Sequence, residues 1–72
     1  MNNSRRIKIQ VISDKIQTLK DELIVLRNEE HKDYDGFPEG FQKQESFIAM
    51  DYIDDATISM SKIQNTLQEV II

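Results

Sequence analysis

The stretch IQVISDKIQTLKDELIVL, residues 9–26, decides the fold of this 72-residue chain. Its apolar side chains recur at alternating spacings of three and four residues, which is the heptad pattern of helices that pack on other helices. No glycine or proline interrupts the stretch, so a continuous helix is expected. The side chains that form this seam are Ile9, Ile12, Ile16, Leu19, Leu23 and Leu26.

The first helix can extend from Ser4, as its N-cap, to about Tyr34. Glu30 and Asp33 are the next seam positions, so either the helical bundle ends there or polar side chains line a pocket. Residues 35–40, DGFPEG, hold both glycines and the only proline, which predicts a short connection between two antiparallel helices.

The second helix begins at about Pro38 or Gln42 and continues to the end of the sequence. We therefore predict one all-α domain over residues 1–72, an antiparallel hairpin with helices at about 4–34 and 38–71. Its apolar stripe has a mean spacing close to 3.5 residues. That stripe consists of Ala49, Tyr52, Ala56, Met60, Ile63, Leu67 and Val70.

A chain of this size buries little apolar surface alone, and it contains no cysteine for a disulfide or a thiolate metal site. Self-association is the remaining source of stability, so we expect the hairpins to form a homo-oligomeric helical bundle. A homodimer covers most of both stripes, and a tetramer is the alternative assembly. The expected oligomer interface comprises Ile9, Ile12, Ile16, Leu19, Leu23, Leu26, Ala56, Met60, Ile63, Leu67 and Val70.

Composition excludes several classes of function. The net charge is −4, and residues 35–72 hold two basic and seven acidic side chains, which disfavours binding to duplex nucleic acid. No run approaches the roughly 18 apolar residues of a membrane span, and the N-terminal stretch lacks a signal-peptide core. We expect a cytoplasmic protein without membrane partners.

Carboxylate clusters are the candidates for chemistry. Asp51, Asp54 and Asp55 lie close together on a helix, but no histidine accompanies them, so a solvated helix face is favoured over a metal or acid–base site. Glu29, Glu30 and His31 are adjacent and point in different directions. No nucleophile, phosphate-binding loop or zinc spacing is present, so we expect neither an enzyme nor a cofactor.

All five aromatic residues lie in or beside the connection, from Tyr34 to Tyr52. They form either a plug that closes the bundle or the wall of a ligand pocket, where aromatic faces stack on bases. Arg5, Arg6 and Lys8 form a small basic patch that is either a solvated end or an anion contact. The expected ligand-binding residues are Arg27, Glu30, Tyr34, Phe37, Glu39, Phe41, Gln42 and Lys43.

The connection also carries a resemblance. Residues 37–45, FPEGFQKQE, followed by Ala49 and Ile53-Asp54, resemble a group of small helical-hairpin proteins of phages and their bacterial hosts. Those proteins share a Pro-Glu-x-x-Gln-x-x-Glu bend between two helices. The resemblance implies the hairpin fold. By looser analogy, the chain also resembles small phage proteins that sequester nucleotide immune signals.

Two functions follow as hypotheses. The first is a phage-derived, non-catalytic oligomer in the host cytoplasm that sequesters a nucleotide-like immune signal at inter-subunit pockets near the bend. The second is a coiled-coil protein-interaction or structural module whose outer residues Ile24, Val25 and Ile58 engage a host or phage protein.

Overall fold

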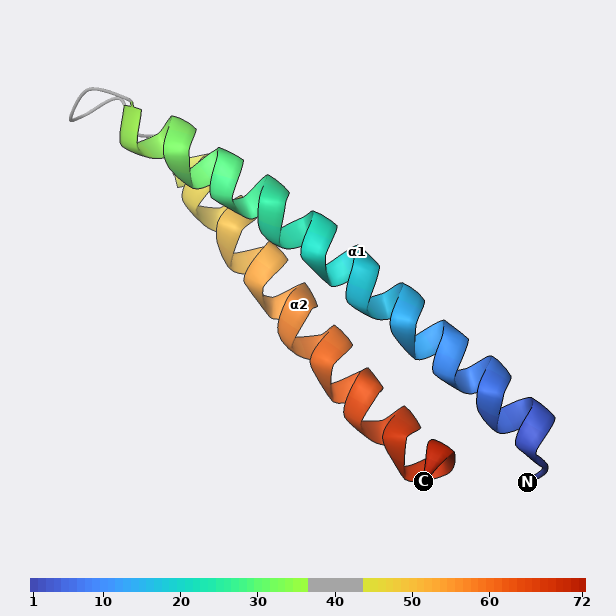
Figure 1. The fold of residues 1–72 in the computed structure, drawn as a ribbon. Helices are drawn as coiled ribbons and strands as arrows, with labels where there is room; N and C mark the ends of the chain where they lie inside the picture. Colours follow the sequence, from blue (N-terminus) through green and yellow to red (C-terminus); the bar gives the residue numbers. More distant parts are fainter. Residues whose placement is uncertain (37–43) are drawn as a thin grey trace.

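The computed structural model describes residues 1–36 and 44–72, with side chains at 1–36 and 45–72. Two long helices, α1 (Asn3–Gly36) and α2 (Gln44–Ile71), lie side by side and run in opposite directions (Figure 1). The expectation of an all-helical hairpin whose two helices pack on each other is confirmed. α1 is slightly longer than expected, whereas residues 38–43 of the expected second helix lie outside the described residues.

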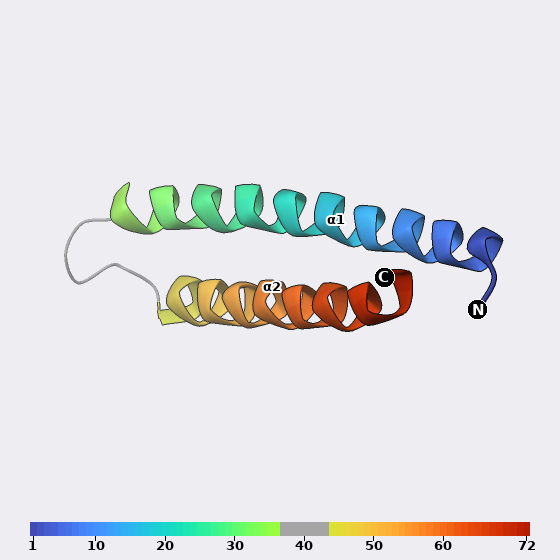
Figure 2. The same ribbon diagram turned by 60° about the horizontal axis from the view of Figure 1, so that its bottom comes forward.

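The hairpin is a rod with a single layer of two helices. Its extents are 57 × 15 × 13 Å, and its radius of gyration is 16.8 Å. A compact domain of this length has a radius of gyration of about 11 Å. The N-terminal end of α1 extends past the C-terminal end of α2 (Figure 2). No helix within 1–36 and 44–72 combines the length and the apolar composition needed to cross a membrane.

The start of α1 differs from the sequence expectation. The side-chain oxygen Oδ1 of Asn2 accepts a hydrogen bond from the backbone N–H of Arg5 at 2.9 Å, and the Asn2 carbonyl accepts one from Arg6 at 3.2 Å. This is the geometry of an N-cap, in which a short polar side chain satisfies a free donor of the first turn. Asn2 therefore caps α1, and Ser4 lies within its first turn.

The surface of α1 that contacts α2 consists of two neighbouring rows of residues spaced seven apart. The first row is apolar and half-buried: Ile9, Ile16 and Leu23. The second row is polar, and Ser13 in it is buried while Lys20 and Arg27 are half-buried. α2 contributes two matching rows. The first consists of Ile53, Met60 and Leu67, and the second of Met50, Thr57 and Gln64.

Little of the chain is fully buried. Among the described residues Met50 is the one buried apolar side chain, and two small polar residues, Ser13 and Ser46, share this burial. The accessible surface is 5651 Å². A compact monomer of this mass exposes about 4,600 Å². The isolated hairpin thus leaves roughly 1,000 Å² more surface in water than a compact fold would.

Candidate functional site

The exposed side of the heptad seam forms a continuous apolar surface. Ile12, Leu19 and Leu26 border the contact row of α1, and they remain 50%, 49% and 54% exposed. On α2, the row that borders the contact residues in the same way is half-buried except at Ile63, which is 50% exposed. Leu26 and Ala49 line the same groove, so the two rows lie on one side of the hairpin. We call this surface the apolar face: Ile12, Leu19, Leu26, Ala49, Ala56, Ile63 and Val70.

The opposite side of the hairpin is held together by polar groups. Lys20 Nζ donates to Gln64 Oε1 at 3.0 Å. Gln64 Nε2 in turn donates to Gln17 Oε1 at 3.2 Å and to the Ser13 carbonyl at 3.3 Å. One glutamine of α2 therefore contacts three residues of α1, and these contacts fix the register of the two helices.

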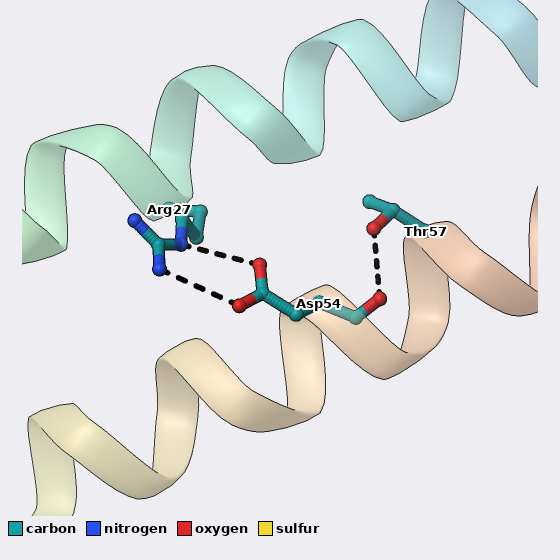
Figure 3. A network of polar contacts seen from close by, with 3 residues as sticks. All are labelled: Arg27, Asp54 and Thr57. Atoms are coloured by element: carbon teal, nitrogen blue, oxygen red, sulfur yellow. Dashed lines mark hydrogen bonds and ion pairs between the residues drawn. The ribbon is translucent and has the colours of Figure 1, made fainter.

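A second polar link lies closer to the connection (Figure 3). Arg27 of α1 donates from Nε to Asp54 Oδ1 at 3.2 Å and from Nη2 to Asp54 Oδ2 at 3.4 Å. The hydroxyl of Thr57 donates to the backbone carbonyl of Asp54 at 2.8 Å. The guanidinium thus binds both carboxylate oxygens, an arrangement that restricts the orientation of both side chains.

A groove of about 540 Å³ lies at the connection end of the apolar face. Its floor is formed by Leu26, Ala49 and Ile53, together with the buried Ser46. Four carboxylates surround this floor, and they belong to Glu29, Glu30, Asp33 and Glu45. The volume is in the range of small-molecule sites, but the negative charge favours a cationic occupant over a phosphate.

A smaller hollow of about 400 Å³ lies at the other end of the rod, between the start of α1 and the end of α2. Arg6 lies in its wall beside Ile71. The Nε atom of Arg6 is buried and has no hydrogen-bond partner among the described residues.

Charge is distributed unevenly along the rod. Residues 1–20 hold five basic and one acidic side chain, for a net charge of +4. Residues 21–36 hold two basic and six acidic side chains, and residues 44–57 hold four acidic ones, so each segment has a net charge of −4. Because α1 and α2 are antiparallel, both acidic segments lie at the connection end, and the basic segment lies at the opposite end.

Three of the eight expected ligand-binding residues lie in the described part of the chain, and these three have different surroundings. Arg27 is engaged with Asp54, Glu30 lines the groove, and Tyr34 is half-buried on the row of α1 that contacts α2. The remaining five, Phe37, Glu39, Phe41, Gln42 and Lys43, lie outside the described residues. The sequence alone did not indicate that Glu29 and Glu45 line a groove together with Glu30. They come together because the end of α1 lies beside the start of α2.

The expected interface residues divide between two surfaces. Ile9, Ile16 and Leu23 face α2 within the hairpin, as do Met60 and Leu67 on α2. The others form the apolar face. A heptad seam does not distinguish these two roles, because rows on either side of it are equally apolar.

Two of the carboxylate candidates are exposed surface groups. Asp51 and Asp55 are exposed, while Asp54 binds Arg27. His31 Nδ1 lies 3.4 Å from Asp35 Oδ2, one helical turn away, and both side chains are half exposed or more. Within the described part of the chain, no group of three His, Cys, Asp or Glu side chains is arranged to hold a metal ion.

No protein-family model, curated protein or solved structure matches the chain. The apolar face, the groove and the charges are the features of the hairpin that bear on its function.

Proposed function

We propose that this chain is a non-catalytic interaction module that docks its apolar face on another helical surface. The supporting observation is the contrast between the two sides of the hairpin. Hydrogen bonds from Lys20 and Gln64 lie on the polar side, where Ile24 is 43% exposed, whereas the other side leaves four large apolar side chains half exposed. Contiguous apolar surface of this kind marks a site of association in soluble proteins.

The energetic gain from docking is moderate. Ile12, Leu19, Leu26 and Ile63 are each about half exposed. Completing their burial gives roughly 1 kcal/mol for each side chain, or about 4 kcal/mol from one chain. This gain has to exceed the loss of translational and rotational freedom, so both partners must contribute apolar surface. A helical partner with its own exposed heptad row meets that requirement.

Solvent protection of single cysteines tests this function, because the chain has no cysteine of its own. Leu19→Cys and Ile63→Cys place a thiol on the apolar face, and Gln17→Cys places one on the polar side as the control. Their labelling rates are compared in purified protein and in extract of the expressing cells. At a partner concentration of about ten times the dissociation constant, the first two thiols should react about tenfold more slowly than the control.

The pattern of protection identifies the type of partner. Protection in the purified protein indicates self-association, and protection only in extract indicates another protein. If all three thiols react at the same rate in both conditions, the apolar face is not a docking surface and the proposal is wrong.

Sequestration of a nucleotide-like immune signal is a second candidate. It is favoured by the volume of the groove, about 540 Å³, and opposed by the four carboxylates around it. A thermal-shift panel of nucleotides, cyclic nucleotides and ADP-ribose derivatives tests it. A selective increase in melting temperature would support this function, and a flat panel would contradict it.

A further inference from the structure

The charged side chains beside the apolar face of α1 change sign halfway along the helix. Four exposed residues recur every seven positions, two basic ones followed by two acidic ones. They border Ile12, Leu19 and Leu26 on the side that points away from α2, because heptad geometry places them one position outside that row. We call them the charge row: Lys8, Lys15, Glu22 and Glu29.

This order is unfavourable within α1 itself. A helix is stabilised by acidic side chains near its N-terminus and basic ones near its C-terminus. α1 has no acidic residue in its first turn and no basic residue in its last turn. Its first turn instead contains Arg5 and Arg6, and its last turn contains Asp33 and Asp35. The charge order therefore has no explanation in the stability of the isolated helix.

We propose that a second copy of the chain covers the apolar face, with the two α1 helices antiparallel and a two-fold axis passing beside Leu19. In this arrangement Lys8 of each copy lies opposite Glu29 of the other, and Lys15 lies opposite Glu22. In the apolar row, Leu19 meets Leu19 of the second copy and Ile12 meets Leu26. The proposal rests on the proposed function, for which it names the partner and its orientation.

The ends of the rod support the same orientation. Arg5 and Asp33 occupy the same seven-residue row as Leu19, each fourteen residues from it, so they also lie opposite each other in the pair. In this arrangement the start of α1 lies over the groove of the second copy. That groove holds four carboxylates, and the start of α1 carries the exposed residues Arg5 and Lys8. The acidic groove thus receives the basic end of a second copy.

Charge also decides against the other two-fold arrangement of two stacked hairpins. With the axis parallel to the rod, the connection ends of both copies lie together. Each copy brings Glu29, Glu30, Asp33 and Glu45 to that end, with no matching basic cluster among the described residues nearby. Like charges in such proximity repel, whereas the antiparallel arrangement pairs each acidic end with a basic one.

The surface area is of the right size. The hairpin exposes 5651 Å², which is roughly 1,000 Å² more than a compact monomer of its mass. Stable dimers bury about 800 Å² on each partner. Contact with one second copy is therefore large enough to bury most of the excess surface.

Disulfide cross-linking of single-cysteine variants tests the orientation, because a disulfide requires Cα atoms within about 7 Å of each other. Leu19→Cys alone should form a covalent dimer at least about tenfold faster than the polar-side control Gln17→Cys. Ile12→Cys and Leu26→Cys should each cross-link slowly alone and rapidly as an equimolar mixture. With the axis parallel to the rod, α1 lies over α2 of the second copy, so rapid cross-linking in an equimolar mixture of Ile12→Cys and Ile63→Cys would overturn the orientation.

Failure of the second-copy proposal can be distinguished from failure of the proposed function. If no variant cross-links faster than the control while the apolar-face thiols are protected in extract, the face binds another protein and the second copy is wrong. If the thiols are unprotected everywhere, both proposals are wrong.

Charge reversal tests the pairing independently of cysteines. Lys8→Glu with Lys15→Glu makes the charge row uniformly acidic, and the dissociation constant of the homodimer should rise at least about tenfold. Adding Glu22→Lys and Glu29→Lys reverses the whole row and should restore homodimers. In a mixture, native mass spectrometry should show this reversed chain avoiding the wild-type chain. An unchanged dissociation constant in the first variant would overturn the pairing. All four positions are exposed, and circular dichroism checks that each variant keeps its helices.

Discussion

The side chain of Asn2 fixes where α1 begins. Its Oδ1 atom accepts the Arg5 N–H at 2.9 Å, so Asn2→Ala leaves a donor of the first turn without this partner. We expect the free energy of unfolding to fall by about 0.5–1 kcal/mol, because the cap lies at an exposed end. Urea unfolding monitored by circular dichroism measures the change. Ser4→Ala is the matched control. If both variants lose the same free energy of unfolding, Asn2 is not the N-cap.

The Arg27–Asp54 contact stabilises the hairpin modestly. The two side chains are 32% and 46% exposed, so water screens their attraction. We expect Arg27→Gln and Asp54→Asn each to lower the free energy of unfolding by about 0.5–1 kcal/mol.

The double variant separates the contact from the individual side chains. If the two groups act as a pair, the double variant should be about as stable as either single one, which a double-mutant cycle in urea detects. Additive losses would show that the contact contributes nothing.

Single residues were the scale at which the sequence predicted least. Arg27 is expected to bind a ligand because it is a cation near the aromatic connection, and in the hairpin its guanidinium is bound to Asp54. A partner 27 positions away in the sequence becomes evident only once the register of the two helices is fixed. The same register explains Gln64, which the sequence did not single out and which contacts three residues of α1.

At the scale of the helices, Met50 is the one buried apolar side chain among the described residues, and it is 5% exposed. Met50→Ala removes buried apolar atoms, and we expect a loss of about 2 kcal/mol in the free energy of unfolding. Ile58→Ala, on the exposed side of α2, should change it by less than about 0.5 kcal/mol. Urea unfolding at matched protein concentration compares them. Equal effects would mean that Met50 is not part of the core.

The two helices themselves were predictable, because they follow from a periodic apolar pattern and from one cluster of helix breakers. The rows that face α2 were not predictable. The hairpin contact uses Ser13, Lys20 and Arg27 beside the apolar row, whereas periodicity favoured the fully apolar seam. Small and long polar side chains suit that row because Ser13 permits close approach and Lys20 and Arg27 reach partners on α2.

At the scale of the whole molecule, the charge pairs of the proposed dimer predict a dependence on salt. Exposed ion pairs are screened as ionic strength rises. The dissociation constant, measured by analytical ultracentrifugation, should increase several-fold between about 50 and 500 mM sodium chloride.

A variant with an unpaired charge row provides the control. In Lys8→Glu with Lys15→Glu the row is repulsive, so salt should strengthen association instead of weakening it. A wild-type dissociation constant that does not change with salt would contradict the role assigned to these charges.

The scarcity of buried side chains links the lifetime of this protein to its abundance. In the proposed dimer, a hairpin with one buried apolar residue among those described gains much of its stability from the second copy that covers its apolar face. Below the dissociation constant of that contact, the chain spends more time unfolded and is open to proteolysis. Newly made chains then persist only after their concentration passes a threshold, so the amount of protein in a cell responds steeply to its rate of synthesis.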